Sequence, residues 1–450
     1  MMWFEGMGGQ RATRWVLGAG LLLGCGGDDG GRASEGGDTG PGVLSIGSAT
    51  ENDDVSEESG GGKFDVFVSD AGNAGDCPGG GGGMDGEVDF SLIWIANSPE
   101  GTVSKIDTQT GVELARYYSG PTNGVDDPSR TSVNLAGDVA VTNRSGGITK
   151  IAARENGCVD ANNNGTIETS TGPNDVLPFG QDECVLWHLP LPNGGSNQQG
   201  PRPTAWDAGA TNNPCAVDSY RVWVGFYDLP INSGHFYRLA GNDGTILDEV
   251  ITPNWKIEAP GGYGPYGGAV DSGGNFWVTG LRGPLVRIDA VTLDYQQWEA
   301  PAGTAFYGMT VDADGEPWMA GLNGELTHFD PATQSFEVFQ IGANSLRGLQ
   351  IDRNGTLWAA VNGQCGVAQF DVASRTIVNP LIPLPGCGTP VGVSIDVDGN
   401  VWVPDQGANN AYKMDPLTYA TSVTPGLVAP YTYSDMTGAG LGLVYNPPAG

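Results

Sequence analysis

The chain has 450 residues, of which 74 are glycine, and its formal net charge at pH 7 is −32. So acidic a composition excludes nucleic acid and anionic membrane surfaces as partners, because contacts to phosphate groups need clustered lysine and arginine. It is compatible with divalent cations, with cationic ligands or with a solvated acidic surface, and the length allows one large domain or several small ones.

The first 25 residues are typical of an export signal. Arg11 and Arg14 precede the stretch WVLGAGLLLGC, which ends at Cys25. A short basic region followed by an apolar run too short to cross a bilayer as a mature helix favours a secretory signal peptide. Its Leu-Leu-Gly-Cys ending resembles a bacterial lipobox, and this resemblance implies cleavage before Cys25 and a lipid on its thiol. An ordinary signal peptide with an incidental cysteine is the alternative.

Residues 26–88 are predicted to form a flexible acidic tether. They consist largely of glycine, aspartate, glutamate and serine. Such a stretch buries too little apolar surface to offset the entropy of ordering it. We therefore expect a folded domain held at the bacterial cell envelope, on the outer membrane or its periplasmic or surface side, with membrane contact only through the lipid.

A unit of about forty residues then repeats, most clearly at 264–280, 305–321, 345–361 and 389–405. Each copy has an apolar strand ending in aspartate, a glycine-containing turn and a strand around a tryptophan, followed by two further strands. Four short strands per unit with no helical period indicate a β-propeller blade. A lone blade cannot bury its apolar face, so we expect the recurring tryptophans to pack between neighbouring blades.

Seven tryptophan-position strands predict seven blades. The first blade lacks an obvious preceding strand, and the ending TGAGLGLVYN resembles the missing one. A C-terminal strand in that position would close the ring and remove exposed sheet edges. The expected fold is therefore all-β, a seven-bladed propeller of four-stranded blades over residues 89–450, acting as a monomer.

Six cysteines remain if Cys25 carries a lipid, and an even number in an exported chain predicts disulfides. Closing a loop of 20 to 30 residues is worth about 3 kcal/mol in the chain-entropy model. Two local pairs are expected, and a third follows by elimination: Cys158–Cys184, Cys365–Cys387 and Cys77–Cys215.

An insertion at about 154–200 contains the stretch DANNNGTIETST. Alternating oxygen donors followed by a turn glycine resemble the first part of an EF-hand-type calcium loop. The candidate calcium ligands are Asp160, Asn162, Asn164 and Thr166. The twelfth position is Thr171 in place of an acid, and Asp175, Asp182 or Glu183 are the possible replacements. An asparagine-rich turn held by a disulfide is the alternative.

The repeat GPYGGAVDSGGNFWVT resembles that of the streptogramin (virginiamycin B) lyase family, which is related to NHL-type propellers, over about residues 90–446. The resemblance implies a magnesium-assisted elimination in which a Pro-His-Gly histidine and a Trp-Phe-Thr-Glu glutamate point into the central funnel. The histidine position is occupied here by Tyr266, Tyr307, Arg347 and Val391 in the clear repeats, and by Arg202, Ser129 and Thr437 in the others. At the glutamate position only Asp405 keeps an acid.

These substitutions favour a binding module over an enzyme. Arg202, Tyr266, Tyr307 and Arg347 form a predicted funnel that suits a small-molecule, sugar or protein ligand, since arginine and aromatic faces recognise carboxylates and rings. The alternative for these side chains is simple filling of a narrow channel. A lyase-type enzyme with altered residues, using Mg²⁺, is the second hypothesis, and a purely structural surface protein is the third.

Overall fold

The structure is a computed structural model that describes residues 91–192, 199–208, 220–253, 255 and 263–445. The signal peptide, Cys25, the tether and the proposed Cys77–Cys215 pair lie outside the described residues. Within them, no helix has the length and apolar character needed to cross a bilayer.

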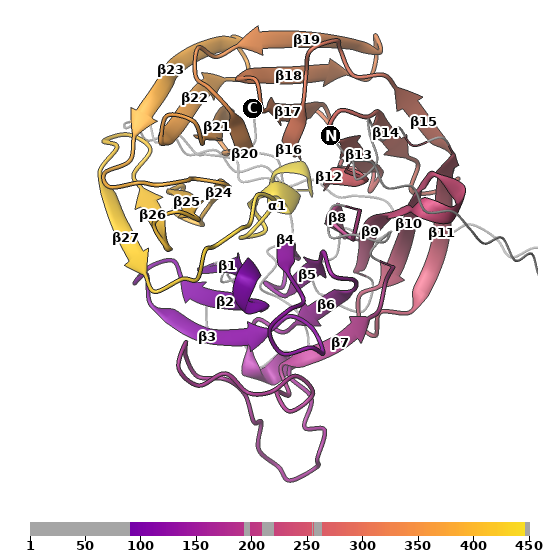
Figure 1. Cartoon of the computed structure of the whole chain (residues 1–450), viewed down its shortest axis with the longest axis vertical. Helices are drawn as coiled ribbons and strands as arrows, with labels where there is room; N and C mark the ends of the chain where they lie inside the picture. The colour runs from indigo at the N-terminus through magenta and orange to yellow at the C-terminus, as the bar shows by residue number, and fades with distance from the viewer. Residues whose placement is uncertain (1–90, 193–198, 209–219, 254, 256–262, 446–450) are drawn as a thin grey trace, which may run out of the picture. The chain divides into compact units, whose positions relative to one another are not determined.

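Seven antiparallel sheets are arranged as blades of a ring (Figure 1). Blade 1 contains β1 (Leu92–Asn97), β2 (Thr102–Asp107) and β3 (Glu113–Tyr118). Blades 2 and 3 contain β4 (Pro128–Val133), β5 (Val139–Asn143), β6 (Ile148–Ile151), β7 (Val185–Leu189), β8 (Thr204–Asp207), β9 (Arg221–Asp228), β10 (Ser233–Ala240) and β11 (Ile246–Pro253). Blades 4 and 5 contain β12 (Pro265–Val270), β13 (Phe276–Gly280), β14 (Leu285–Ile288), β15 (Tyr295–Trp298), β16 (Phe306–Val311), β17 (Pro317–Gly321), β18 (Glu325–Asp330) and β19 (Ser335–Gln340).

Blades 6 and 7 contain β20 (Leu346–Ile351), β21 (Thr356–Val361), β22 (Gly366–Asp371), β23 (Thr376–Pro383), β24 (Ser394–Ile395), β25 (Val401–Asp405), β26 (Asn410–Met414) and β27 (Thr421–Pro425). The described helices are short: η1 (Ser98–Glu100), η2 (Glu155–Gly157), η4 (Leu229–Ile231) and α1 (Ala439–Tyr445). The all-β, seven-bladed propeller expected from the repeats is confirmed.

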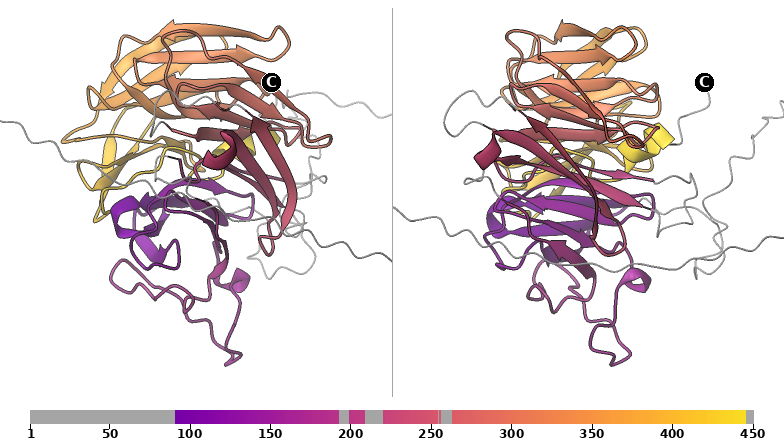
Figure 2. Two further views of the ribbon diagram at one scale, coloured as in Figure 1. Left: turned by 45° about the vertical axis from the view of Figure 1, so that its right-hand side comes forward. Right: turned by 90° about the vertical axis from the view of Figure 1, so that its right-hand side faces the viewer.

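In blades 2 to 7 the first strand lies nearest the ring axis and the fourth lies at the rim (Figure 1). We call β4, β8, β12, β16, β20 and β24 the inner strands. The first face is the side of the ring at which the inner strands begin, and the second face is the side at which they end. In the right-hand view of Figure 2, η4 and α1 lie on opposite faces of the disc.

The ring is closed by residues 430–436, which supply the inner segment of blade 1. The Trp94 N–H donates to the Met436 carbonyl at 2.9 Å, and the Tyr431 N–H donates to the Ala96 carbonyl at 2.8 Å. A further antiparallel bridge joins Asn97 to Pro430. Closure by the C-terminal part of the chain is thus confirmed, and blade 1 gains its fourth segment.

The particular stretch expected to close the ring, TGAGLGLVYN, was wrongly assigned as a strand. Its residues 439–445 form helix α1, which contacts β12, β16 and β20 near the axis. The inner position beside β1 is already filled by residues 430–436, so the following residues cannot pair there. Their apolar side chains Leu441, Leu443 and Val444 are buried instead against the ends of the inner strands.

A hydrogen bond between aspartate and tryptophan recurs in the last four blades. The aspartate that ends the inner strand accepts the indole N–H six residues later, as in Asp352 with Trp358 at 2.9 Å. The other pairs lie at 2.8 or 2.9 Å: Asp271–Trp277, Asp312–Trp318 and Asp396–Trp402. The turn glycine between them has positive φ, 75° at Gly355, which other residues adopt only with strain.

The tryptophans also join neighbouring blades, as expected. Trp318 packs with Leu346 and Phe370 of blade 6. Trp402 packs with Ile93 and Ile95 of blade 1. The recurring indole is therefore buried between blades and anchored by one carboxylate.

Both predicted local disulfides are present, Cys158–Cys184 and Cys365–Cys387. The first brackets the insertion, which protrudes from blade 2 between β6 and β7 (Figure 1). Because β7 occupies residues 185–189, that part of the expected insertion at 154–200 belongs to the blade.

Candidate functional site

The predicted funnel residues lie where inner strands begin. A β-bulge interrupts β12, β16 and β20 at this point, between Pro265 and Gly267, between Phe306 and Gly308, and between Leu346 and Leu349. The bulges include Tyr266, Tyr307 and Arg347. Because a bulge re-aims the side chain it carries, the same register places these side chains together at the first face.

The structure brings all four predicted funnel residues together. The ring centroids of Tyr266 and Tyr307 are 5.2 Å apart. The guanidinium carbon of Arg202 lies 5.2 Å from the Tyr266 ring, and that of Arg347 lies 4.3 Å from the Tyr307 ring. Residues from four different blades thus meet around one axis.

Two central members of this group were missed by the sequence analysis. Tyr433, from the closing segment, lies 4.6 Å from Tyr307 between ring centroids. The guanidinium carbon of Arg130 lies 3.4 Å from the centre of the Tyr433 ring. The repeat alignment selected Thr437 and Ser129 in their place. Correct identification of residues 430–436 as the closing segment would have pointed to Tyr433.

The two residues selected in their place lie close by but make different contacts. Ser129 occupies the bulge of β4, and its neighbour Arg130 supplies the charged side chain. Thr437 is at the other end of the closing segment, where its hydroxyl donates to the Ile395 carbonyl at 2.6 Å. Thr437 therefore belongs to the second face.

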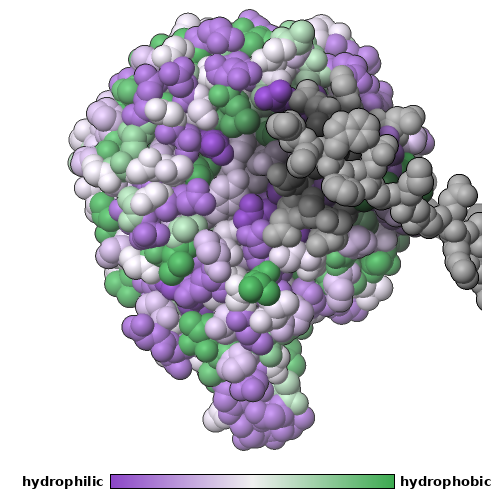
Figure 3. All heavy atoms as spheres, viewed as in Figure 1, coloured by the Kyte–Doolittle hydropathy of each residue, from purple (hydrophilic) through white to green (hydrophobic). Residues whose placement is uncertain are grey.

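We define the tyrosine–arginine cluster as Arg130, Arg144, Arg202, Arg347, Tyr263, Tyr266, Tyr307, Tyr431 and Tyr433. Tyr266, Tyr307 and Tyr433 are at most 3 % exposed and form its floor. Tyr263 and Tyr431 are only partly buried and form its rim. Figure 3 shows the first face, where polar side chains surround the hollowed centre beside the grey residues. The floor does fill the channel, so a ligand would have to bind at the rim.

Positive charge in this cluster is incompletely neutralised. Arg130 donates to two backbone carbonyls, those of Tyr433 and Tyr307, each at 3.0 Å. The side chain of Arg347 donates to the Asn362 side chain at 3.5 Å and also interacts with the Tyr307 hydroxyl. Neither guanidinium has a carboxylate of the described residues within ion-pair distance, in contrast to Arg144, which pairs with Asp127. The Nε atoms of Arg130 and Arg347 are buried without a hydrogen-bond partner among the described residues.

The pKa values of the cluster tyrosines reflect their burial and the positive charge of the nearby guanidinium groups. Burial raises the pKa of Tyr266 and of Tyr431 well above the usual value. Burial also disfavours the ionised form of Tyr433, but the guanidinium groups around it, led by that of Arg130, outweigh this effect and lower its pKa. The cluster therefore stabilises negative charge next to Arg130.

Asp405, the one acid kept at the family's glutamate position, is bound to the backbone. Its carboxylate accepts the N–H groups of Gly388 at 2.7 Å and Thr389 at 2.6 Å. It also accepts those of Gly407 and Ala408, both at 3.0 Å. The side chain is fully buried. These contacts hold the loop beside the Cys365–Cys387 disulfide and give Asp405 a structural role in this loop.

None of the three histidines lies on an inner strand. His188 is in β7, His235 in β10 and His328 in β18. His328 lies near Asp312 and Glu316, and its Nε2 atom is 2.6 Å from Glu316. Because the same aspartate turn occurs in three other blades without a histidine, this group serves the blade structure.

The candidate calcium loop places its oxygen atoms close together. The Asp160 carboxylate accepts the N–H groups of Asn164 and Gly165, at 3.1 and 2.9 Å. The Asn164 side-chain oxygen accepts the Thr166 N–H at 2.8 Å. Glu168, which the sequence analysis did not select, receives the amide N–H groups of Asn162 and Asn164 at 2.8 and 2.7 Å. These hydrogen bonds lower the pKa of Glu168, so it remains ionised.

All three proposed replacements for the twelfth ligand contact this stretch, and Glu183 is the one that contacts residues 160–168, where the other candidate ligands lie. Its carboxylate accepts the N–H groups of Ala161 and Glu168, both at 2.9 Å. Asp182 binds Ser170, and Asp175 binds Thr171. The arrangement is rich in oxygen and exposed, and calcium binding here stays a prediction.

No protein-family model matches the chain, and no curated protein matches it in sequence. Solved structures are similar in fold. A protein from Lactobacillus plantarum is 14 % identical over 76 % of this chain and 98 % of its own, with a TM-score of 0.53. A functionally unknown protein from Desulfotomaculum acetoxidans is 11 % identical over 75 % of this chain and 96 % of its own, with a TM-score of 0.52.

Virginiamycin B lyase from Staphylococcus aureus is also similar. It is 16 % identical over 68 % of this chain and 87 % of its own, with a TM-score of 0.45. The seven blades themselves confirm the propeller fold that the repeat resemblance implied, and at these identities the likeness to solved structures is one of fold alone.

Proposed function

We propose that this protein is a lipid-anchored propeller of the bacterial envelope that binds a carboxylate-bearing ligand at the tyrosine–arginine cluster without transforming it. The observation that carries the proposal is the charge of Arg347, which is only partly buried and has no carboxylate of the described residues within ion-pair distance, in a chain whose net charge is −32. Burying a guanidinium without an anionic partner costs free energy. A bound carboxylate would recover that cost.

The side chains indicate which ligand chemistry fits. Arginine binds carboxylates through paired N–H donors. The rim rings of Tyr431 and Tyr263 add flat surfaces for an aromatic or sugar ring. The guanidinium group of Arg144 packs against the Tyr431 ring, with its central carbon 4.9 Å from the ring centroid. A small aromatic acid, a sugar acid or a peptide C-terminus would meet these requirements.

Ligand binding can be tested with matched probes. The soluble propeller is titrated with benzoate and glucuronate, and with their neutral counterparts benzamide and glucose, while its melting temperature is followed. We expect stabilisation by the acids only, and a loss of affinity of at least about tenfold in Arg347→Met, as for a lost charged hydrogen-bond pair. Arg375→Met is the control and should bind normally. Arg375 forms an exposed ion pair with Glu337 of β19, at the outer edge of the ring and away from the cluster. Equal responses to acids and neutral probes would reject the proposal.

Two further assays test the remaining parts of the proposal. Cys25→Ser should move the protein from the membrane fraction to the soluble fraction. Incubation with magnesium and a type B streptogramin should leave that antibiotic intact. Ring opening that disappears in Arg347→Ala would replace the binding function with the lyase-type alternative.

A further inference from the structure

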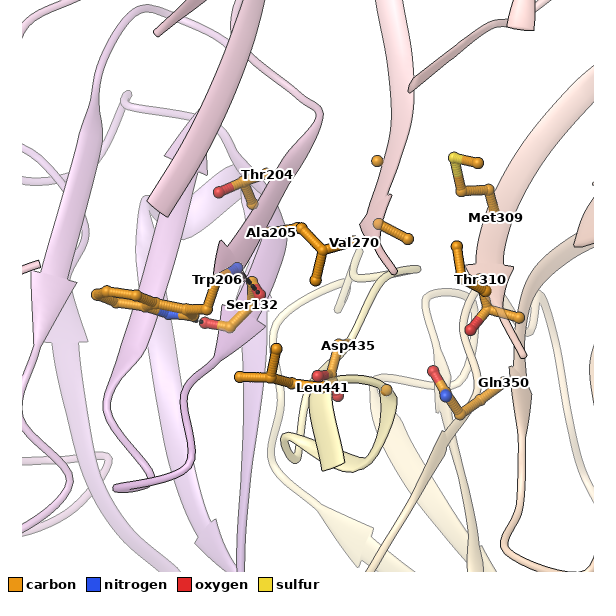
Figure 4. Close-up of a pocket in the computed structure, with 14 residues that line it drawn as sticks. Ser132, Thr204, Ala205, Trp206, Val270, Met309, Thr310, Gln350, Asp435 and Leu441 are labelled. Carbon is orange, nitrogen blue, oxygen red and sulfur yellow. Dashed lines mark hydrogen bonds between the residues drawn. The ribbon is translucent and has the colours of Figure 1, made fainter. Parts of the chain in front are cut away.

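A small cavity on the ring axis belongs to the packing of α1. It lies between the inner strands and this helix, and its volume of about 30 Å³ holds about one or two water molecules (Figure 4). Its one carboxylate, that of Asp435, accepts the N–H groups of Thr437 at 3.2 Å and Gly438 at 2.9 Å and so caps the turn before α1. This cavity is too small for an organic ligand.

A larger cleft opens between blades 4 and 5. Its volume is about 350 Å³, which is within the range of about 300–1,000 Å³ typical of small-molecule sites. The turn after β12, parts of β13, β14 and β15, and two turns of blade 5 line it. Because the turns that follow the inner strands lie at the second face, the cleft opens there, on the opposite side of the ring from the tyrosine–arginine cluster.

In three other blades a cationic side chain bridges to the next blade at the corresponding place. Each of these side chains lies directly opposite a blade tryptophan in the antiparallel register. Each donates to a backbone carbonyl one or two residues after the corresponding strand of the next blade: Lys105 to Ala153 at 3.3 Å, Arg238 to Ala290 at 2.6 Å and Lys413 to Thr108 at 2.7 Å. A direct hydrogen bond therefore closes these junctions.

Arg287 of β14 occupies this position in blade 4, opposite Trp277, but makes no such bond. Within the described residues its guanidinium has no hydrogen bond, and the carboxylate oxygens near it, of Asp289 and Asp271, are 3.7 and 3.8 Å away. Pro331, directly after β18, is the corresponding residue of blade 5, and it lines the cleft. The cleft thus stands where the other junctions have a bridge, and Arg287 leaves N–H donors free in its wall.

The side chains that line the cleft offer both donors and acceptors. Arg287 has free N–H groups, Asp314 has carboxylate oxygens and Gln296 has both; neither of the last two has a side-chain hydrogen bond within the described residues. The partly buried indole of Trp298 adds a flat apolar surface. With two carboxylates, of Asp271 and Asp314, beside one guanidinium, the lining disfavours an anion. A neutral ligand with many hydroxyl groups fits, because a hydroxyl both donates and accepts and the C–H face of a sugar ring covers an indole.

We propose that the cleft between blades 4 and 5 binds a neutral disaccharide unit of a glycan. One ring packs on Trp298, and hydroxyl groups accept hydrogen bonds from Arg287 and donate them to Asp314. A hexose displaces roughly six water volumes, or about 180 Å³, so the cleft has room for two rings, and a single ring leaves half of it filled with water. Glucose alone should therefore bind too weakly to detect.

Calorimetric titration of the full chain carrying Cys25→Ser tests this site with four disaccharides: maltose, cellobiose, lactose and N,N′-diacetylchitobiose. At up to about 10 mM, which detects a Kd near 1 mM, we expect heat of binding from at least one of them and none from glucose. Arg287→Met, which keeps an apolar stem without the N–H donors, should weaken that binding at least about tenfold, as expected for hydrogen bonds from a charged group.

A pair of matched variants separates a filled cleft from a damaged blade. Ser272 and Arg353 follow the aspartate in equivalent turns of blades 4 and 6, and both are exposed. Of these two, Ser272 lines the cleft. Ser272→Trp should remove disaccharide binding, Arg353→Trp should leave it unchanged, and both variants should keep the melting temperature of the parent protein.

The site is independent of the tyrosine–arginine cluster. Arg347→Met should bind the disaccharide as the parent does, and Arg287→Met should keep the response to benzoate, so the failure of one proposal leaves the other standing. Absence of heat from all four disaccharides, equal binding in Ser272→Trp and Arg353→Trp, unchanged affinity in Arg287→Met, or binding lost in Arg347→Met would overturn the disaccharide site.

Discussion

Replacement of Asp352 by alanine tests whether the recurring aspartate holds the blades together. The Asp352 carboxylate accepts three N–H groups, from Trp358 Nε1 at 2.9 Å, Asn354 at 2.8 Å and Thr356 at 3.0 Å. Trp358 is 1 % exposed, so its indole N–H would lose its partner where water cannot replace it. A hydrogen bond to a charged group contributes about 1.5–3 kcal/mol, and the two turn amides can turn to solvent. We therefore expect Asp352→Ala to lower the free energy of unfolding by about 3 kcal/mol.

Urea unfolding followed by tryptophan fluorescence measures this loss. Asp415→Ala is the matched control, because Asp415 also accepts three hydrogen bonds, from Leu417 and Thr418, but lies in an exposed turn with no tryptophan. Asp352→Asn, which keeps one acceptor oxygen, should fall between the two. If Asp352→Ala and Asp415→Ala shift the midpoint equally, the buried aspartate–tryptophan bond is not what stabilises the blade.

Three further predictions concern the covalent, topological and metal-binding features of the chain. Replacing Cys365 and Cys387 by serine should cost about 3 kcal/mol of stability, seen as a lower urea midpoint under oxidising conditions, and an unchanged midpoint would contradict it. Deleting residues 430–450 should expose the inner edge of β1 and remove cooperative thermal unfolding, since an open sheet edge favours aggregation; a deletion variant with the full-length melting curve would disprove closure by this segment. Asp160→Asn should remove one site from a calcium titration of the propeller without changing its melting temperature in chelator, and an unaltered titration would remove the insertion loop as a calcium site.

Local chemistry made the blades predictable. The strand, aspartate, glycine-turn and tryptophan pattern depends on contacts between residues less than ten positions apart, such as Asp352 and Trp358. The repeat therefore indicated both the number of blades and the burial of the indoles. Cys158–Cys184 and Cys365–Cys387 were also predictable, because each closes a short loop within or beside a single blade.

The funnel was predicted in part for the same reason. Tyr266, Tyr307 and Arg347 occupy equivalent positions in clear repeats, and equivalent residues of a ring must meet at its axis. Arg130 and Tyr433 lie in blades whose repeats are weak, and their register could not be read from the pattern. Glu168 escaped notice because it stands at the ninth position of a loop whose acid was sought at the twelfth.

The sequence by itself determined the blade, its turns and its local disulfides, since these rest on interactions between near neighbours in the chain. Only the tertiary structure decided which C-terminal residues pair with β1 and which fold into α1. That choice depends on contacts across more than 300 positions, such as Ala96 with Tyr431, which a local pattern cannot show. The same choice places α1 against β12, β16 and β20, where Leu441 and Val444 are buried.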